Sequence, residues 1–316
     1  MKKLTLALSA IAAAFSATAS ADVSVSGSSS ASYVSNASTT DNTDLIVGTN
    51  VAFAMSTTTA GGVGISASLG ANLTPDTDVT VGSVSGGNSV TFTTGGATIT
   101  VGDVEVADTP GSVGGAVGGI VGDNNDLNTN VGSGMIDDDG TGIKFSSAVG
   151  ASTLTLTYVA NDSDNNHGVI NESGEDSAMS VGVSMPMGMY TISVGVADSD
   201  TGEAASGASV SAAMGGGTLV IGYSTQTTVT ANADITTAGD TQVLGATYAM
   251  SLDADTSVKV GYQSAKDADS DSTTRMDAAI SRSLGGGASV YLDMRTLNGD
   301  GATTGTAIGF GTSVSF

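Results

Sequence analysis

The stretch Thr304–Phe316, TGTAIGFGTSVSF, alternates two kinds of side chain from one residue to the next. The first set is Thr304, Thr306, Ile308, Phe310, Thr312, Val314 and Phe316, and the second is Gly305, Ala307, Gly309, Gly311, Ser313 and Ser315. A period of two places these sets on opposite faces of a β-strand. One face is apolar or threonine-rich, and the other is small and polar. The stretch therefore predicts a strand that separates two unlike environments.

The N-terminus predicts export from the cytoplasm. Met1, Lys2 and Lys3 form a positive segment, an apolar run follows from Leu4 to Ala17, and Ala19-Ser20-Ala21 fits a small-x-small cleavage site. We expect residues 1–21 to be a cleaved signal peptide and residues 22–316 to form one domain. Without Lys2 and Lys3, the chain carries 6 bases against 31 acids, a formal charge of −25.

Composition excludes several classes of protein. The chain has no cysteine, so disulfides do not stabilise it. No window after residue 21 holds the 18 apolar residues of a transmembrane helix. A chain this acidic will not bind nucleic acid through its phosphates, and it should attract cations.

The rest of the chain repeats the alternation between two kinds of connection. Short connections contain glycine, which supplies the positive φ of tight hairpin turns; they lie at 60–62, 95–96, 149–150, 186–188, 215–217 and 285–287. The longer ones are rich in Asp, Asn, Ser and Thr and span 35–44, 74–88, 103–140, 161–176, 198–206, 226–240, 264–273 and 296–302. We expect sixteen strands of about 9–11 residues, with both termini at the short-turn end.

Two unlike faces suit a closed barrel in a membrane. Closure satisfies every edge hydrogen bond, as a bilayer requires. The small polar inner face would line water and could not fill a dry core. A soluble β-solenoid or adhesin is the alternative, but a solenoid should show a fixed repeat of about 20–50 residues, and the sequence has none. The prediction is an all-β fold, a 16-stranded antiparallel transmembrane β-barrel with short periplasmic turns and long extracellular loops.

Three segments, in this order, resemble the Gram-negative general porins, in particular the sixteen-stranded outer-membrane porins of alphaproteobacteria. They are ADVSVSG at 21–27, TITVGD at 98–103 and the closing strand that ends at Phe316. The resemblance covers the whole chain. It implies a homotrimer in the bacterial outer membrane, with a water-filled pore in each subunit for passive diffusion of small hydrophilic solutes and no enzymatic activity. It also implies that the barrel assembly machinery recognises Phe316.

The resemblance further implies that the loop after the fifth strand folds into the barrel and narrows it. By strand order this is the segment 103–140, with Asp103, Glu105, Asp108, Asp123 and Asp126 as pore-facing acids. The opposing bases should be Lys144, Lys259 and Arg295, which alternate with apolar neighbours. The excess of acids predicts a cation-selective pore. The alternative interpretation is that these acids are ordinary solvated charges.

Other charged residues suggest different roles. Arg282 is in step with Met276 and Ile280, so we expect it on the lipid side, near the turn at 285–287, with its head at the interface. Oxygen-rich clusters suit calcium, and the candidate ligands are Asp137, Asp138, Asp139, Asp162 and Asp164; no other cofactor is expected. A hydrolase would depend on His167, the only histidine. A non-conducting structural barrel or adhesin is the main alternative to a pore, and a barrel enzyme is a distant third.

Overall fold

The computed structural model describes residues 22–36, 43–73, 89–104, 141–160, 177–200, 204–228, 239–266, 272–299 and 304–315. The strands within these ranges are β1 (Asp22–Asn36), β2 (Thr43–Thr58), β3 (Gly64–Leu73), β4 (Ser89–Thr94), β5 (Ala97–Asp103), β6 (Thr141–Val149), β7 (Ser152–Ala160), β8 (Ser177–Met187), β9 (Tyr190–Ser199), β10 (Ala204–Met214), β11 (Gly217–Thr228), β12 (Gly239–Ser251), β13 (Thr256–Lys266), β14 (Ser272–Gly285), β15 (Ala288–Gly299) and β16 (Gly305–Ser315).

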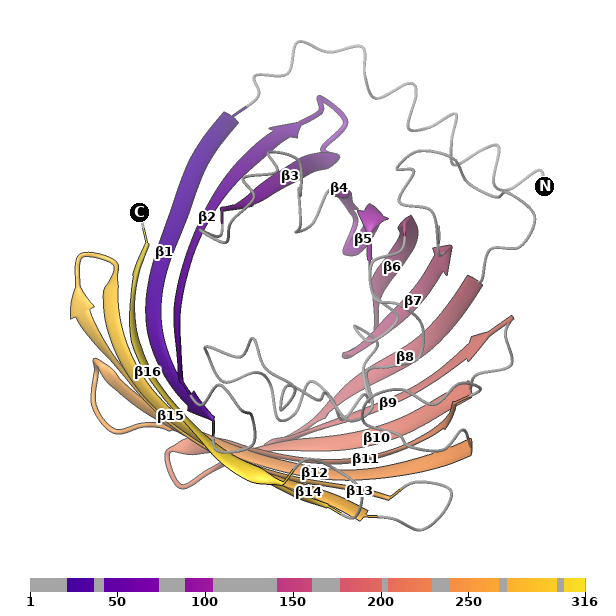
Figure 1. The fold of residues 1–316 in the computed structure, drawn as a ribbon. Coiled ribbons are helices and arrows are strands. Elements are labelled where there is room, and N and C mark those ends of the chain that lie inside the picture. Colours follow the sequence, from indigo (N-terminus) through magenta and orange to yellow (C-terminus); the bar gives the residue numbers. More distant parts are fainter. Residues whose placement is uncertain are drawn as a thin grey trace.

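The strands form one closed antiparallel sheet. Each pairs with its neighbours in the chain, and β1 pairs with β16 to complete the barrel (Figure 1). At this seam Ser28 lies opposite Ser315 and Asn36 lies opposite Ala307. The sixteen-stranded antiparallel barrel predicted from the sequence is therefore confirmed. None of the described residues belongs to a helix long and apolar enough to cross a membrane.

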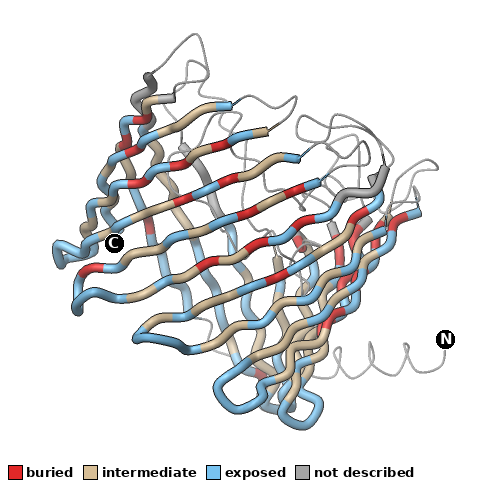
Figure 2. Tube along the Cα trace, turned by 90° about the horizontal axis from the view of Figure 1, so that it is seen from below, coloured by how far each residue is buried: buried red, intermediate tan, exposed pale blue. Residues whose placement is uncertain are grey.

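The two faces of the wall differ as the alternation predicts. On β16, Ile308, Phe310 and Val314 are exposed on the outer face, as expected. Phe316, the last residue of the same alternating set, lies outside the described residues. Buried positions alternate along the strands with exposed or intermediate ones (Figure 2).

The described residues contain no extended dry core. Of their seven buried apolar residues, only Val243 and Ala265 form a cluster. Among the largest fully buried side chains are Arg275 and Gln263, both polar. The strand ladder and the outer apolar face must therefore supply most of the stability of the described wall.

The short turns are formed in two ways, by glycine or by side-chain hydrogen bonds. At Gly95 and Gly96, between β4 and β5, φ is +55° and +82°, the conformation of a hairpin turn that only glycine adopts easily. The turn between β12 and β13, residues 252–255, has no glycine and was not among the turns predicted from the sequence. There the backbone N–H groups of Asp255 and Thr256 donate to Asp253 Oδ1, at 2.8 and 2.7 Å.

These bonds also favour the ionised form of Asp253. Together with the hydroxyl of Thr256, which donates to Asp253 Oδ2 at 3.2 Å, they stabilise the carboxylate. The backbone N–H of Asp255 contributes most, and the pKa of Asp253 is lowered below its ordinary value. An ionised aspartate side chain thus replaces the glycine that the other short turns use.

The height of the wall is uneven. β4 has 6 residues and β5 has 7, whereas β2 has 16 and β14 has 14. At about 3.3–3.4 Å per residue, β5 is about 23 Å long and β2 about 53 Å. The expectation of about 9–11 residues per strand is therefore wrong for the shortest and the longest strands. The mean number of residues per strand does not show that one side of the barrel has short strands and another side has long ones. β5, the strand before the longest connection, belongs to the short side (Figure 1).

Candidate functional site

Basic residues concentrate on one part of the wall. All six bases of residues 22–316 lie in described strands, and five of them are on the adjacent strands β13, β14 and β15. These five are Lys259, Lys266, Arg275, Arg282 and Arg295, and the sixth, Lys144, is on β6. Apart from Lys144, the positive charge of the described wall is therefore confined to these three strands.

Two of these bases form a buried cluster around one carboxylate. Arg275 and Asp277 lie two residues apart on β14 and face the same way, while Arg295 on β15 lies directly opposite Asp277. Arg275 Nε donates to Asp277 Oδ2 at 2.9 Å, and Arg295 Nε donates to Asp277 Oδ1 at 2.9 Å. The side chains of Arg275 and Asp277 are each 2% exposed, and that of Arg295 is 6% exposed. Asp277 therefore bridges two guanidinium groups.

The cluster continues along β15 over glycines of β16. Asp293 lies two residues before Arg295 on the same face and opposite Gly309. A Cβ at Gly309 would collide with the Asp293 carboxylate, and one at Gly311 would collide with the Tyr291 ring. The side chains of Tyr291 and Asp293 on β15 therefore lie across Gly311 and Gly309 of β16, which have no side chains. Asp293 Oδ2 is buried and has no hydrogen-bond partner among the described residues.

Two further residues complete this inner wall, which we define as Lys259, Gln263, Arg275, Asp277, Asp293 and Arg295. Gln263 on β13 lies opposite Arg275 and is buried. Lys259 lies opposite Ala279 of β14, on the same face as Asp277. Three bases and two acids give this wall a formal charge of +1. The wall is therefore nearly charge-compensated and is not a ladder of uncompensated arginines.

The predicted site residues fall into two groups. Lys144, Lys259 and Arg295 lie on the inward side of their strands, and Lys144 sits between Thr100 and Thr157 of the neighbouring strands. Whether the three line a conducting path stays a prediction. Asp103 ends β5, opposite Thr141. The other predicted residues lie outside the described ranges: Glu105, Asp108, Asp123, Asp126, Asp137, Asp138, Asp139, Asp162, Asp164 and Phe316.

The site residues predicted from the sequence do not include Arg275, Asp277 and Asp293. The signal was available, because a hairpin centred on Gly286 brings residue 277 opposite residue 295. Charges at Arg275, Asp277, Asp293 and Arg295 then fall on one face, two residues apart within each strand. By contrast Arg282 was placed correctly. It is exposed, in the outward row of β14, and its Nη1 donates to Thr256 Oγ1 at 3.0 Å.

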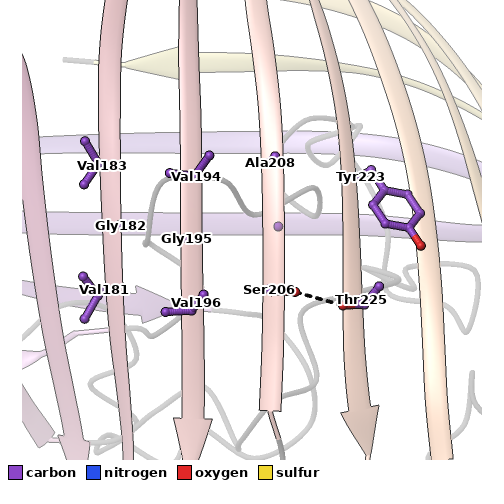
Figure 3. A pocket seen from close by; sticks show the side chains of 11 residues that line it. Val181, Gly182, Val183, Val194, Gly195, Val196, Ser206, Ala208, Tyr223 and Thr225 are labelled. Atoms are coloured by element: carbon purple, nitrogen blue, oxygen red, sulfur yellow. Dashed lines mark hydrogen bonds between the residues drawn. The ribbon is translucent and has the colours of Figure 1, made fainter.

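Two other features of the described residues bear on ligand binding. No group of three His, Asp or Glu side chains suited to a metal occurs among the described residues. An apolar depression of about 480 Å³ lies over β8–β11, lined by Val181, Val183, Val194, Val196 and Tyr223 (Figure 3). These side chains belong to the outward rows of their strands, so the depression is part of the apolar exterior.

The architecture has many counterparts among solved structures. A porin structure refined at 1.8 Å superposes with a TM-score of 0.67 at 18% identity, over 93% of this chain and 100% of that one. A mutant of the Rh. blastica porin superposes with a TM-score of 0.66 at 15% identity, over 93% and 100%. An anion-selective porin from Comamonas acidovorans superposes with a TM-score of 0.64 at 13% identity, over 94% and 100%. No curated protein matches the chain by sequence.

The sequence itself matches a family. The model that describes the Gram-negative porins matches residues 7–302, nearly the whole chain. The match thus covers the strands β1 to β15 and the connections between them. The chain therefore belongs to the Gram-negative porin family and is a β-barrel of the outer membrane.

Proposed function

We propose that the protein is an open channel through which small hydrophilic solutes and ions diffuse passively across the outer membrane. The observation that carries the proposal is the inner wall, where Arg275, Asp277 and Arg295 face the interior of a closed barrel with an apolar exterior. Buried charges need counter-charges or water, and this arrangement suits an interior that solutes traverse. Porins are channels, so no catalytic role is assigned to any residue.

The constriction should lie between the inner wall and the segment 103–140. Asp103 at the end of β5, together with Glu105, Asp108, Asp123 and Asp126, would provide its acidic side. Lys259 and Arg295, with Lys144 on β6, would provide its basic side. The short β5 supports this proposal, because the wall is lower at the strand that precedes this segment than at β2 or β14.

The channel should prefer cations. The inner wall contributes only +1, whereas residues 22–316 carry a formal charge of −25. A lumen with low-dielectric walls focuses the field of these acids. The Comamonas acidovorans porin has the same fold and is anion-selective, so the fold does not determine whether a porin prefers cations or anions. Here the sign would follow from the acids in the long loops.

Assembly completes the proposal. Residues 1–21 would be removed on export, Phe316 would be recognised by the barrel assembly machinery, and three copies would associate as a homotrimer. Calcium bound at Asp137, Asp138, Asp139, Asp162 and Asp164 would neutralise part of the loop charge. Such binding would weaken the cation preference without abolishing conduction.

Reconstitution into a planar lipid bilayer tests the proposal. The expected result is stepwise, ohmic conductance and a reversal potential of cationic sign under a salt gradient, larger at low salt where the Debye length is about 30 Å at 0.01 M. Neutralising Asp123 and Asp126 together should move that potential toward zero. A folded barrel without conductance would overturn the channel and favour a structural barrel or adhesin. Anion selectivity after calcium chelation would overturn the selectivity.

A further inference from the structure

The seam between β1 and β16 closes the barrel and joins the first strand of the chain to the last (Figure 1). Nine pairs of described residues form it, whereas fourteen pairs join β1 to β2. Most of the seam residues are Ser, Gly, Ala or Thr. Among the nine pairs only Tyr33 with Phe310 joins two large side chains, whose ring centroids lie 5.4 Å apart. The side chains of the two strands therefore provide little packing across the seam.

The side chain of Tyr291 on β15 crosses β16 toward β1. Tyr291 lies opposite Gly311 of β16, and Gly311 lies opposite Ser32 of β1, so the three residues form one row on the inner face. A Cβ at Gly311 would collide with Cζ and Oη of Tyr291 and also with the backbone oxygen of Ala31. The end of the tyrosine ring therefore lies over β16 and beside the backbone of β1. Glycine at 311 permits this close approach.

Asp293 makes the same crossing in the next row along the strands. It lies opposite Gly309 of β16, and Gly309 lies opposite Val34 of β1. Asp293 Oδ1 occupies the place that a Cβ at Gly309 would take. We call Tyr291 and Asp293 together the seam bridge, because each side chain begins on β15 and extends over β16.

Burial along β1 changes at the rows that the seam bridge crosses. On the inward face of this strand Ser28 is exposed and Ser30 is intermediate. Ser32 and Val34, which follow on the same face, are only 5% and 7% exposed. Ser28 and Ser32 are the same kind of residue on the same face of one strand. The difference in their exposure therefore comes from what lies over Ser32, and the crossing side chain is Tyr291.

We infer that the seam bridge is a closing contact of the barrel, which links β15 to β1 across the last strand. Separating β1 from β16 would expose Val34 and the end of the Tyr291 ring to water, in addition to breaking the strand ladder. The bridge thus adds burial to a seam whose own pairs are small. It also makes closure depend on β15, because Tyr291 must lie over Gly311 before it can contact β1. An open seam would leave backbone groups unpaired within the bilayer.

Thiol labelling tests whether Tyr291 covers β1, because the chain has no cysteine of its own. Ser32→Cys and Ser28→Cys place the same thiol on one face of β1, under the bridge and beyond it. With a small water-soluble thiol reagent, we expect Ser32→Cys to react at least about tenfold more slowly, since a buried group reacts only through local opening. Adding Tyr291→Ala should abolish this difference, and adding Tyr291→Phe, which keeps the ring, should retain it.

Two results would overturn the inference. One is equal labelling of Ser32→Cys and Ser28→Cys while Tyr291 is present, a comparison that needs no change at Tyr291. The other is a difference that survives Tyr291→Ala, because Ser32 would then be covered by something else.

A disulfide across the seam tests whether the bridge resists its opening. Ala31 of β1 and Thr312 of β16 lie directly opposite each other, so Ala31→Cys with Thr312→Cys can lock the seam. In denaturant with the disulfide reduced, we expect Tyr291→Ala to unfold at least about tenfold faster than the same protein with Tyr291. With the disulfide oxidised, the two should unfold at equal rates. A tenfold difference that persists in the oxidised barrel would show that Tyr291 does not act at the seam. Neither test measures conductance, so a silent channel would leave this inference intact.

Discussion

Replacing Asp277 by asparagine tests whether one carboxylate holds the inner wall together. Asparagine keeps the volume of aspartate and one acceptor oxygen but removes the charge that bridges Arg275 and Arg295. At a separation of about 4 Å and an effective dielectric of about 20, each ion pair is worth about 4 kcal/mol. Removing one partner of a buried pair typically costs about 3–5 kcal/mol, because the remaining charge stays buried. We expect Asp277→Asn to lower the free energy of unfolding by about 3–5 kcal/mol.

The same change should alter selectivity. The formal charge of the inner wall rises from +1 to +2 when Asp277 is neutralised. Cations should therefore be repelled more strongly at the wall, and the reversal potential under a potassium chloride gradient should move toward the anionic side. Stability is measured from the temperature at which the heat-modifiable folded band disappears, and selectivity is measured in a planar bilayer.

Two variants separate this explanation from a general loss of charge. Asp253→Asn removes the same charge from the whole chain, but Asp253 lies in an exposed turn, 3.8 Å from Arg282 on the outer side. It should leave the reversal potential unchanged. Adding Arg295→Gln to Asp277→Asn restores the wall to +1 and should restore the potential. If Asp277→Asn left the potential at the wild-type value, or Asp253→Asn shifted it equally, the bridging role of Asp277 would be refuted.

Two further predictions concern packing and assembly. Gly309→Ala should destabilise the barrel by about 1–3 kcal/mol, because the new Cβ would collide with the Asp293 carboxylate. Gly48→Ala is the control and should be tolerated, because its Cβ would make only an ordinary contact, 3.5 Å from Ser30. Equal unfolding of both variants in a denaturant series would contradict this prediction. Deleting Phe316 should reduce the folded, heat-modifiable fraction in the outer membrane more than it reduces synthesis, and equal folded amounts with and without Phe316 in membrane fractions would argue against an assembly signal.

The sequence predicted the features that follow from alternation along a strand, such as which face a residue lies on. It did not predict the features that depend on side-chain hydrogen bonds or on the register between strands. The faces of the strand ending near Phe316 follow from alternation, and so does the outward position of Arg282. The turn at 252–255 was missed because Asp253 replaces glycine through side-chain hydrogen bonds. The charge cluster was missed because alternation assigns a face and only the register pairs Asp277 with Arg295. The short β4 and β5 were missed because an average spacing carries no information about individual strands.

Residues 22–316 contain six bases and 31 acids, and the inner wall shows how some of these bases are paired with acids. In an antiparallel sheet, the nearest neighbours on one face are the residue two positions away and the residue directly opposite. Arg275, Asp277 and Arg295 occupy such positions, so two guanidinium groups share one carboxylate. Asp293 extends this compensation along β15. If the proposed channel is correct, this side of it would keep fixed, planar hydrogen-bond donors with little net charge, and the acids in the loops would determine which ions enter.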